Sequence, residues 1–313
     1  MKRVAILGAT GYIGRSLAYA FQDKNEYEVY LFSRSKDDAT KMFAGLLQGK
    51  ELRLYEYGDF FTHQYDVILN CVGIGKPSEF RKDAKSIFKV TEEFDNMILD
   101  YIEKSPDTLY VSLSSGAVYT HGMENGVTPE SKFILDVHNI LPKHMYGIAK
   151  MNSEAKHRAH EHLNIVDLRV FSFFSRFVDP DGGFLMSDIV RCIQSGTVLE
   201  TSGEDMLRDY ICTKDLYALI RACIEKKTLN EAFDAYSIKP VSKFELLDFF
   251  KEKYGLRYAI RTLHDSSSPT GAKNNYFSLN RKAESLGYLP VHTSLSGIDE
   301  EIQSADLFGQ TDL

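Results

Sequence analysis

A glycine-rich segment near the start of the chain, GATGYIG at residues 8–14, constrains the fold more than any other feature. It connects an apolar run of strand length, residues 3–8, to a helical pattern over residues 12–23. At such a junction Gly8 permits the tight turn, Gly11 lets the backbone approach a pyrophosphate, and Gly14 lets the helix pack close to the strand. The free N–H groups and positive dipole end of the helix then bind phosphate. The segment therefore predicts a dinucleotide-binding βαβ unit rather than a glycine turn without a ligand.

Apolar runs of strand length alternate with helical patterns through the first half of the chain. We expect further strands at residues 28–33, 51–57, 65–72, 108–114 and 165–171, and helices at 37–47, 78–104 and 144–162. This βα alternation is typical of a parallel sheet with helices on both faces. The predicted fold class is therefore α/β, a Rossmann-type doubly wound parallel sheet.

The pattern changes after about residue 172, where short helical segments are interspersed with short strands. The helical segments cover residues 185–195, 214–225 and 243–253. Ligands of doubly wound folds bind at the carboxyl edge of the sheet, and a smaller lobe over that edge would complete the site. We expect a dinucleotide-binding Rossmann domain at residues 1–171. Residues 172–313 are expected to form mainly a smaller C-terminal substrate-binding lobe, with some segments returning to the Rossmann domain.

The charge and cysteine content exclude several classes of function. A net charge of −7 gives no electrostatic reason to expect nucleic-acid binding. No stretch approaches the about 20 apolar residues of a membrane span, so no membrane partner is expected. The four cysteines include no CxxC pair, which favours reduced thiols and a cytoplasmic protein. His157, His160 and His162 are predicted to lie at a solvated helix end rather than to bind a metal.

The end of the second predicted strand bears on the choice between NAD and NADP. NAD enzymes usually place an acidic residue there to bind the adenosine ribose, but this chain has Ser33 followed by Arg34. A guanidinium and a hydroxyl suit a 2′-phosphate, which an aspartate would repel. NADP(H) is therefore the favoured cofactor, with NAD(H) possible and a plain solvated turn as the alternative. Asp59 is expected at the adenine edge, and Gly73 against the cofactor.

A tyrosine and a lysine one helical turn apart, Tyr146 and Lys150, form a YxxxK pair. A tyrosine hydroxyl is a poor base at neutral pH, and a nearby cation favours its phenolate form. The tyrosine can then exchange a proton with a carbonyl or alcohol oxygen as hydride moves between cofactor and substrate. Ser114 and Ser115, at the end of the fifth predicted strand, are both candidates to bond the reacting oxygen.

Together these segments resemble the extended short-chain dehydrogenase/reductases, the NAD-dependent epimerase/dehydratase group that acts on sugar nucleotides. The resemblance covers nearly the whole chain. Six segments of this chain are similar to motifs of the family: the glycine loop, SGAVY at 115–119, the YxxxK pair, LRVF at 168–171, RDYICTKDL at 208–216 and AESLGYLP at 283–290. The last two segments are the most specific, because smaller dehydrogenases lack the extended lobe.

The resemblance implies a nucleoside diphosphate sugar as substrate, with Arg208 as a candidate for its diphosphate. It selects Ser115, with Tyr146 and Lys150, as catalytic, and Ser115, Tyr146 and Arg208 as substrate-binding. It also implies a homodimer formed by the helices at 78–104 and 144–162. The expected cofactor contacts are Gly8, Thr10, Gly11, Tyr12, Ile13, Gly14, Ser33, Arg34, Asp59, Phe60, Cys71, Gly73, Ser114, Tyr146 and Lys150.

Departures from the family pattern narrow the expected reaction. Dehydratases carry an Asp-Glu pair where this chain has Gly116 and Ala117, so elimination is disfavoured. Lys89 stands where the family often has asparagine. That difference puts the family's cofactor contacts at Lys89 in doubt. The lack of the Asp-Glu pair and the NADP-like turn favour reduction of a 4-keto group on a sugar nucleotide. The alternatives are a 4-epimerase or 4-oxidase with tightly bound NAD(H), and a non-catalytic dinucleotide-binding regulatory protein.

Overall fold

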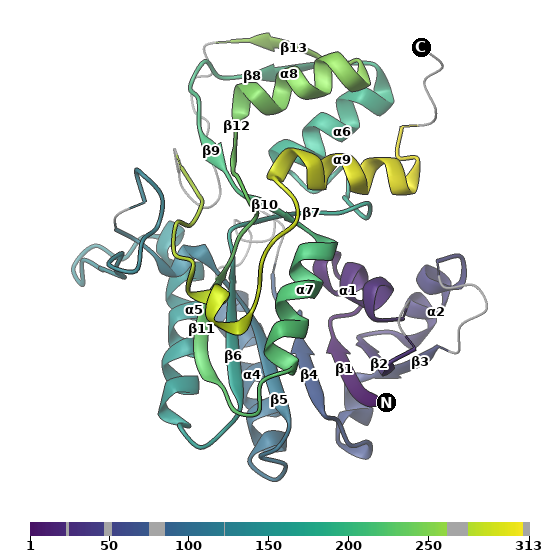
Figure 1. Cartoon of the computed structure of the whole chain (residues 1–313), viewed down its shortest axis with the longest axis vertical. Helices are drawn as coiled ribbons and strands as arrows, with labels where there is room; N and C mark the ends of the chain where they lie inside the picture. Colours follow the sequence, from purple (N-terminus) through teal and green to yellow (C-terminus); the bar gives the residue numbers. More distant parts are fainter. Residues whose placement is uncertain (23–24, 47–51, 75–84, 122, 262–274, 309–313) are drawn as a thin grey trace.

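A parallel sheet of seven strands forms the centre of the protein (Figure 1). The computed structural model describes residues 1–22, 25–46, 52–74, 85–121, 123–261 and 275–308. Across the sheet the strands are β3 (Arg53–Glu56), β2 (Tyr27–Ser33), β1 (Lys2–Leu7), β4 (Val67–Asn70), β5 (Leu109–Ser115), β6 (Ile165–Val170) and β11 (Asn230–Ala235). All neighbouring pairs run parallel. The strand order reverses between β1 and β4, and such a switch point opens a ligand crevice at the carboxyl ends of the strands.

Helices cover both faces of the sheet because the strands are apolar on both faces. In β1, Val4 and Ile6 belong to one buried cluster while Ala5 and Leu7 belong to another, as the alternation of strand side chains requires. The first cluster includes side chains of α1 (Tyr12–Gln22), α2 (Lys36–Ala44) and α7 (Thr213–Ile224). The second includes side chains of α4 (Lys85–Ile102), which packs beside α5 (Pro142–Ala159). Three short 3₁₀ turns are η1 (Tyr57–Thr62), η2 (Gly116–Val118) and η3 (Lys282–Leu286).

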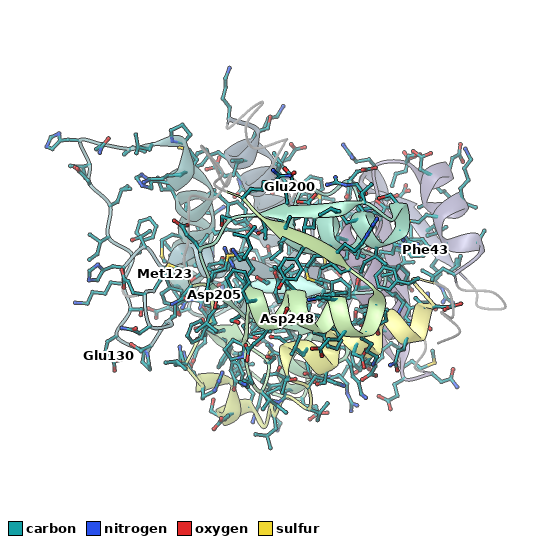
Figure 2. All side chains as sticks on the ribbon, turned by 90° about the horizontal axis from the view of Figure 1, so that it is seen from above. Phe43, Met123, Glu130, Glu200, Asp205 and Asp248 are labelled. Carbon is teal, nitrogen blue, oxygen red and sulfur yellow. The ribbon has the colours of Figure 1, made fainter. Side chains whose placement is uncertain are left out.

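A smaller lobe sits over the carboxyl edge of the sheet (Figure 1). It contains α6 (Leu185–Ser195), α8 (Lys243–Tyr254) and α9 (Ser294–Ala305). Its strands pair as β7 (Ser172–Phe174) with β10 (Tyr210–Cys212), β9 (Leu207–Arg208) with β12 (Val241–Ser242), and β8 (Val198–Thr201) with β13 (Arg257–Ile260). The lobe has its own apolar cluster around Phe174, Leu247 and Phe250. Figure 2 looks down on this lobe, with Glu200, Asp205 and Asp248 labelled on it.

The predicted α/β fold is confirmed, and the element bounds differ mainly at their ends. The helix expected at 144–162 begins at Pro142 and ends at Ala159, and residues 78–84 of the helix expected at 78–104 lie outside the described residues. β11 joins the main sheet beside β6, and α7 packs on α1. Segments after residue 172 therefore do lie against the Rossmann layers. In the described part of the chain, no helix has the length and apolar character to cross a membrane.

The prediction of a solvated histidine cluster is wrong for His157, which is fully buried. Its Nδ1 lies 2.8 Å from a carboxylate oxygen of Asp167, and its Nε2 lies 2.7 Å from Asp95. His160 and His162 are more exposed and contact the Glu103 carboxylate at 2.8 and 3.5 Å. The two aspartates come from α4 and β6, so spacing along α5 gives no signal that His157 lies between them.

Candidate active site

The glycine loop joins β1 to α1 by close backbone contacts that exclude side chains. Gly8 has φ +73°, and a Cβ there would lie 3.0 Å from the backbone of Cys71 and Val72. A Cβ at Gly14 would lie 2.1 Å from the Gly8 carbonyl oxygen. Gly8 and Gly14 are therefore required by the fold itself, and they bring the amino-terminal end of α1 to the carboxyl end of β1. Gly11 is exposed at the turn between them.

Replacing Gly14 with alanine is expected to destabilise the protein and to abolish dinucleotide binding, because the new methyl group collides with rigid backbone. The matched control is Gly45→Ala, where a Cβ meets nothing within 4 Å and φ is −86°. That control should keep or raise the free energy of unfolding, by up to about 1 kcal/mol. Chemical denaturation and NADPH fluorescence titration of both variants make the comparison. Wild-type stability and affinity in Gly14→Ala would contradict this view of the loop.

The two residues predicted to distinguish NADP from NAD, Ser33 and Arg34, lie at the end of β2. Ser33 is buried, and its hydroxyl donates to the Ser35 carbonyl at 2.8 Å, while Arg34 is exposed. Glu56 is the partner of Ser33 in the neighbouring strand, and its carboxylate accepts a bond from the Lys36 backbone N–H at 3.2 Å. Of the two predicted residues, only Arg34 therefore presents an exposed side chain.

Two further predicted cofactor residues lie on η1, which follows β3. Asp59 is exposed, and its carboxylate accepts a bond from the Glu56 backbone N–H at 3.3 Å. Phe60 is fully buried, so only its backbone is available to a ligand. Sequence reasoning missed Tyr57, whose pKa burial raises to about 12 against the opposing effect of a bond from the Gly8 backbone. No motif spacing marks Tyr57 as a neighbour of the glycine loop.

The carboxyl end of β4 forms the other wall of the crevice. The Cys71 N–H donates to the Leu7 carbonyl at 3.0 Å, which ties this end to β1. Burial raises the pKa of the Cys71 thiol to about 12, against the opposing charge of Lys150. The thiol is therefore protonated and unreactive at neutral pH, and it lies within the electrostatic reach of Lys150. Gly73 is exposed, and a Cβ there would meet nothing within 4 Å.

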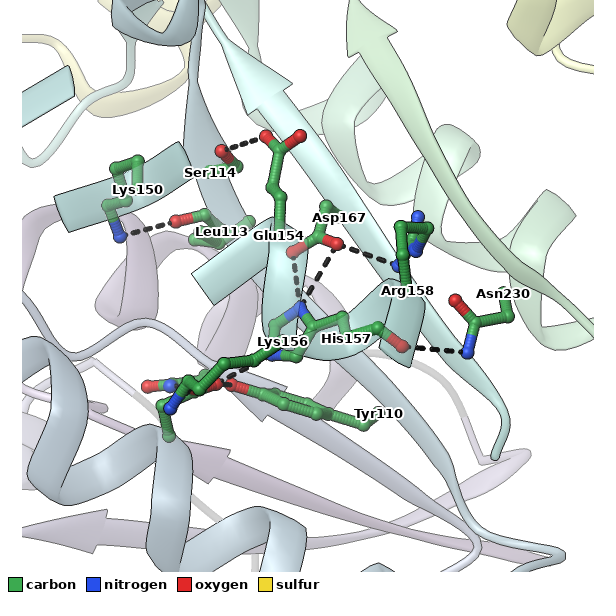
Figure 3. Close-up of polar contacts among 12 residues, drawn as sticks. Tyr110, Leu113, Ser114, Lys150, Glu154, Lys156, His157, Arg158, Asp167 and Asn230 are labelled. Carbon is green, nitrogen blue, oxygen red and sulfur yellow. Dashed lines mark hydrogen bonds and ion pairs between the residues drawn. The ribbon is translucent and has the colours of Figure 1, made fainter. Parts of the chain in front are cut away.

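The YxxxK pair lies on α5, next to the end of β5. A Cβ at Gly147 would lie 2.4 Å from the Ala117 carbonyl oxygen, so this glycine lets α5 approach η2 closely. Lys150 is buried, and its Nζ donates to the Leu113 carbonyl at 2.8 Å (Figure 3). The same Nζ lies 5.9 Å from the ring centroid of the half-buried Tyr146. An ammonium group has three protons to donate, so two remain for a ligand.

The two candidate serines point in different directions, as successive residues of a strand must. Ser114 donates to the Glu154 carboxylate at 2.6 Å (Figure 3). The Ser115 hydroxyl lies 3.0 Å from the hydroxyl of Tyr276, a residue near the lobe strand β9. Ser114 is therefore held by α5, whereas Ser115 faces the segment of the lobe that carries Tyr276. The Glu154 carboxylate also accepts a hydrogen bond from Nε of Arg169, with 3.0 Å between Nε and Oε1.

The lobe places Tyr276 and Arg208 opposite Ser115. The Arg208 guanidinium carbon lies 5.4 Å from the Tyr276 ring centroid. Burial raises the pKa of Tyr276, and the proximity of Tyr146 raises it further. The structure therefore brings together Ser115, Tyr146 and Arg208, which the sequence analysis predicted, and Tyr276, which it missed. Tyr276 lies outside every quoted motif, so its contact with Ser115 had no sequence signal.

The part of the structure around the end of β5 therefore holds a serine hydroxyl bonded to the Tyr276 hydroxyl, and a lysine cation close to the ring of Tyr146. The glycine loop can hold a pyrophosphate at the amino-terminal end of α1. The guanidinium on the lobe can hold a second anion.

The sequence of the chain matches one protein family and is similar to a curated protein. The NAD dependent epimerase/dehydratase family matches residues 4–238 of the chain. A curated relative, the bifunctional polymyxin resistance protein ArnA of Wigglesworthia glossinidia brevipalpis, is 26% identical over 109 residues, or 33% of this chain. The match spans only 16% of that relative's length.

Solved structures share the fold over nearly the whole chain. A UDP-glucose-4-epimerase from Stenotrophomonas maltophila with bound NAD has a TM-score of 0.81 at 17% identity, covering 98% of both chains. The Tyr-to-Phe variant of UDP-glucuronic acid 4-epimerase from Bacillus cereus, bound to NAD and a UDP-sugar, has a TM-score of 0.79 at 18% identity, covering 97% and 99%. A dTDP-glucose 4,6-dehydratase from Bacillus anthracis with NAD has a TM-score of 0.74 at 16% identity. The match covers 98% of this chain and 97% of that chain.

Proposed function

The chain belongs to the NAD dependent epimerase/dehydratase family, and from that membership we propose that it is an NADP(H)-dependent oxidoreductase that reduces a 4-keto group of a nucleoside diphosphate sugar. One observation carries the proposal: Lys150 is bonded to the Leu113 carbonyl of β5 and lies 5.9 Å from the Tyr146 ring, and Ser115 ends the same strand. The residues at the glycine loop suit a dinucleotide cofactor, because Gly8 and Gly14 bring the amino-terminal end of α1 to the carboxyl end of β1 and the exposed Gly11 leaves its backbone open to a pyrophosphate.

The proposed reaction adds a hydride and a proton to a ketone. A nicotinamide cofactor held by the glycine loop would supply the hydride. Tyr146 donates its phenolic proton to the carbonyl oxygen, and the product is a secondary alcohol. Ser115 can donate a hydrogen bond to the same oxygen while it accepts one from the Tyr276 hydroxyl. Lys150 donates to the Leu113 carbonyl, and its remaining protons can hold the nicotinamide ribose.

The proposed substrate class rests on Arg208. Arg208 is placed on β9 by pairing with Val241, and its guanidinium lies next to Tyr276. A planar, permanently charged guanidinium suits a diphosphate, so Arg208 is proposed to bind the diphosphate of the substrate. UDP-sugars are bound in several 4-epimerase structures with this fold, which supports the same class here.

The proposed preference for NADP(H) rests on Arg34. The strand end carries no acid, and the nearby Glu56 carboxylate is engaged by the Lys36 backbone N–H. An exposed guanidinium at this position would pair with a 2′-phosphate. Since the buried Ser33 hydroxyl is used within the turn, Arg34 is proposed as the main selector.

Replacing Arg34 with alanine is expected to weaken NADPH binding by about 10–150-fold, the loss of one or two charge-assisted hydrogen bonds. NADH binding should change by less than about threefold, because NADH lacks the phosphate. Fluorescence titration of both cofactors provides the measurement. Arg53→Ala is the matched control, because Arg53 is a partly exposed arginine whose guanidinium pairs with Glu28. Equal losses for NADPH and NADH in Arg34→Ala would remove the basis for the NADP preference.

The second candidate function is a 4-epimerase or 4-oxidase with tightly bound NAD(H). The observation in its favour is that several of the solved structures with the same fold are 4-epimerases with NAD. Its chemistry would use the same Ser115, Tyr146 and Lys150. A dehydratase is further disfavoured, because a Cβ at Gly116 would lie 2.5 Å from the Phe171 ring and no acid fits there.

The proposed assembly and location follow the same family reasoning. We expect a homodimer through α4 and α5, with the Rossmann domain at residues 1–171 and the substrate-binding lobe mainly at 172–313. Lys89, which replaces the family asparagine, is exposed on α4. All four cysteines are free, which accords with a cytoplasmic protein.

A further inference from the structure

Three potential metal ligands meet where the lobe helix α9 approaches the start of α7. Cys212 is the N-cap residue of α7, Asp215 lies in its first turn, and His292 lies just before α9. All three residues are buried, and their ligand atoms lie within 4.8 Å of one another. This group is separate from Ser115, Tyr146 and Lys150. We propose that Cys212, Asp215 and His292 form a binding site for a divalent transition metal such as Zn²⁺.

The distances within this group fit tetrahedral coordination. With metal–ligand bonds of about 2.0–2.3 Å, the ligand atoms of a tetrahedral zinc site lie about 3.3–3.6 Å apart. Here the Cys212 Sγ lies 3.5 Å from the His292 Nδ1, and that nitrogen lies 3.3 Å from the Asp215 Oδ2. Two of the three separations therefore already match those around a shared ion, and the third, between Cys212 and Asp215, is within 4.8 Å. A solvent molecule would complete the four ligands.

The surroundings of His292 favour its Nδ1 as a ligand. The Nε2 of His292 contacts the Glu300 carboxylate, whose side chain is half-exposed and marks the solvent side of the group. A carboxylate that accepts the Nε2 proton leaves a lone pair on Nδ1, as metal-binding histidines commonly have. That lone pair faces Cys212 and an oxygen of Asp215, and a cation between them removes the repulsion between lone pairs.

The site is held in place by backbone hydrogen bonds. The Asp215 carboxylate accepts bonds from the Val291 and His292 N–H groups, both at 3.1 Å. A carboxylate has enough lone pairs to accept these bonds and to bind a metal. Because the loop before α9 is already fixed to α7, little ordering is needed for binding. The ion would link the helix on the Rossmann sheet to the lobe that covers the active site.

The ligand chemistry selects a borderline transition metal over calcium or magnesium. One thiolate, one imidazole and one carboxylate suit Zn²⁺ or Co²⁺, whereas calcium and magnesium prefer oxygen ligands. Binding breaks the S–H bond of Cys212, forms a metal–sulfur bond and releases the proton to solvent. The thiolate and the carboxylate then balance the charge of the ion.

The test is a titration of metal-free protein with Co²⁺, whose thiolate complexes absorb in the near ultraviolet. Wild-type protein is expected to develop the thiolate-to-cobalt band and visible tetrahedral bands, saturating at one equivalent and displaced by Zn²⁺. Cys212→Ser should lose the thiolate band, and His292→Gln should lose both. Glu300→Gln, which replaces the carboxylate beside Nε2 with a neutral amide, should weaken binding by about 10–100-fold.

Matched controls separate this site from other cysteines and from adventitious sites. Cys192→Ser removes another buried cysteine, and His160→Gln removes a more exposed histidine beside Glu103. Both should keep the wild-type band. Circular dichroism of each metal-free variant checks folding, and Zn²⁺ should raise the melting temperature of wild type but not of Cys212→Ser. Absence of the thiolate band in wild type, or its persistence in Cys212→Ser, would overturn the proposal.

Discussion

Replacing Tyr146 with phenylalanine is expected to lower kcat by about 10²–10⁴-fold, the usual contribution of a positioned proton donor. Phenylalanine keeps the ring beside Lys150 and removes only the hydroxyl. Cofactor affinity should therefore stay close to that of wild type. Turnover of a nucleoside diphosphate 4-keto sugar, followed by NADPH absorbance, measures the loss.

Tyr258→Phe is the matched control for this substitution. Tyr258 lies on β13 of the lobe, and its hydroxyl donates to Asp248 at 2.8 Å. Losing that bond should leave kcat unchanged within a factor of about two. If Tyr146→Phe keeps more than about a tenth of wild-type turnover, another group supplies the proton. If it causes no biological loss at all, the non-catalytic regulatory alternative gains support.

Replacing His157 with alanine is expected to lower the free energy of unfolding by about 3–5 kcal/mol, because it leaves two buried carboxylates without their shared partner. Asp95 and Asp167 lie on opposite sides of the imidazole, and Lys156 and Arg158 each contact one of them from the surface (Figure 3). Denaturant titration provides the measurement.

His160→Ala, one helical turn further along, provides the control. His160 is partly exposed and contacts Glu103. Its loss should change the free energy of unfolding by no more than about 1 kcal/mol. Equal stability of the two variants would show that the buried arrangement around His157 adds nothing to the fold.

The same cluster predicts how stability depends on pH. Burial disfavours the imidazolium, but the carboxylates of Asp167 and Asp95 outweigh it and raise the pKa of His157 from 6.5 to about 9. A raised folded-state pKa means that the stabilisation is fully present below about pH 6.5 and is lost as pH rises through about 9. The difference in stability between wild type and His157→Ala should therefore shrink between these values.

The fold could be predicted because its signals are local. The glycine loop, the apolar strands and the amphipathic helices each depend on neighbouring residues, and Gly14 shows in the structure the close packing that its spacing predicted. The bounds of α6 at Leu185–Ser195 match the predicted segment. The strand β11 was missed, because its residues carry mixed polarity and join the sheet only through β6.

The candidate site could be predicted only in part. Tyr146 and Lys150 follow from helical spacing, and Glu154, one further turn along, could have been placed on the same face. Tyr276 and Tyr57 reach the site from segments without a motif, so only tertiary structure shows them. The burial of His157 depends on two aspartates from other elements.

The most direct test of the central claim is the cofactor that the purified protein carries and uses. The account predicts that the protein releases its cofactor readily, binds NADPH more tightly than NADH, and oxidises NADPH when given a nucleoside diphosphate 4-keto sugar. Tightly held NAD(H), with epimerisation of a nucleotide sugar and no net consumption of NADPH, would contradict it and establish the 4-epimerase alternative.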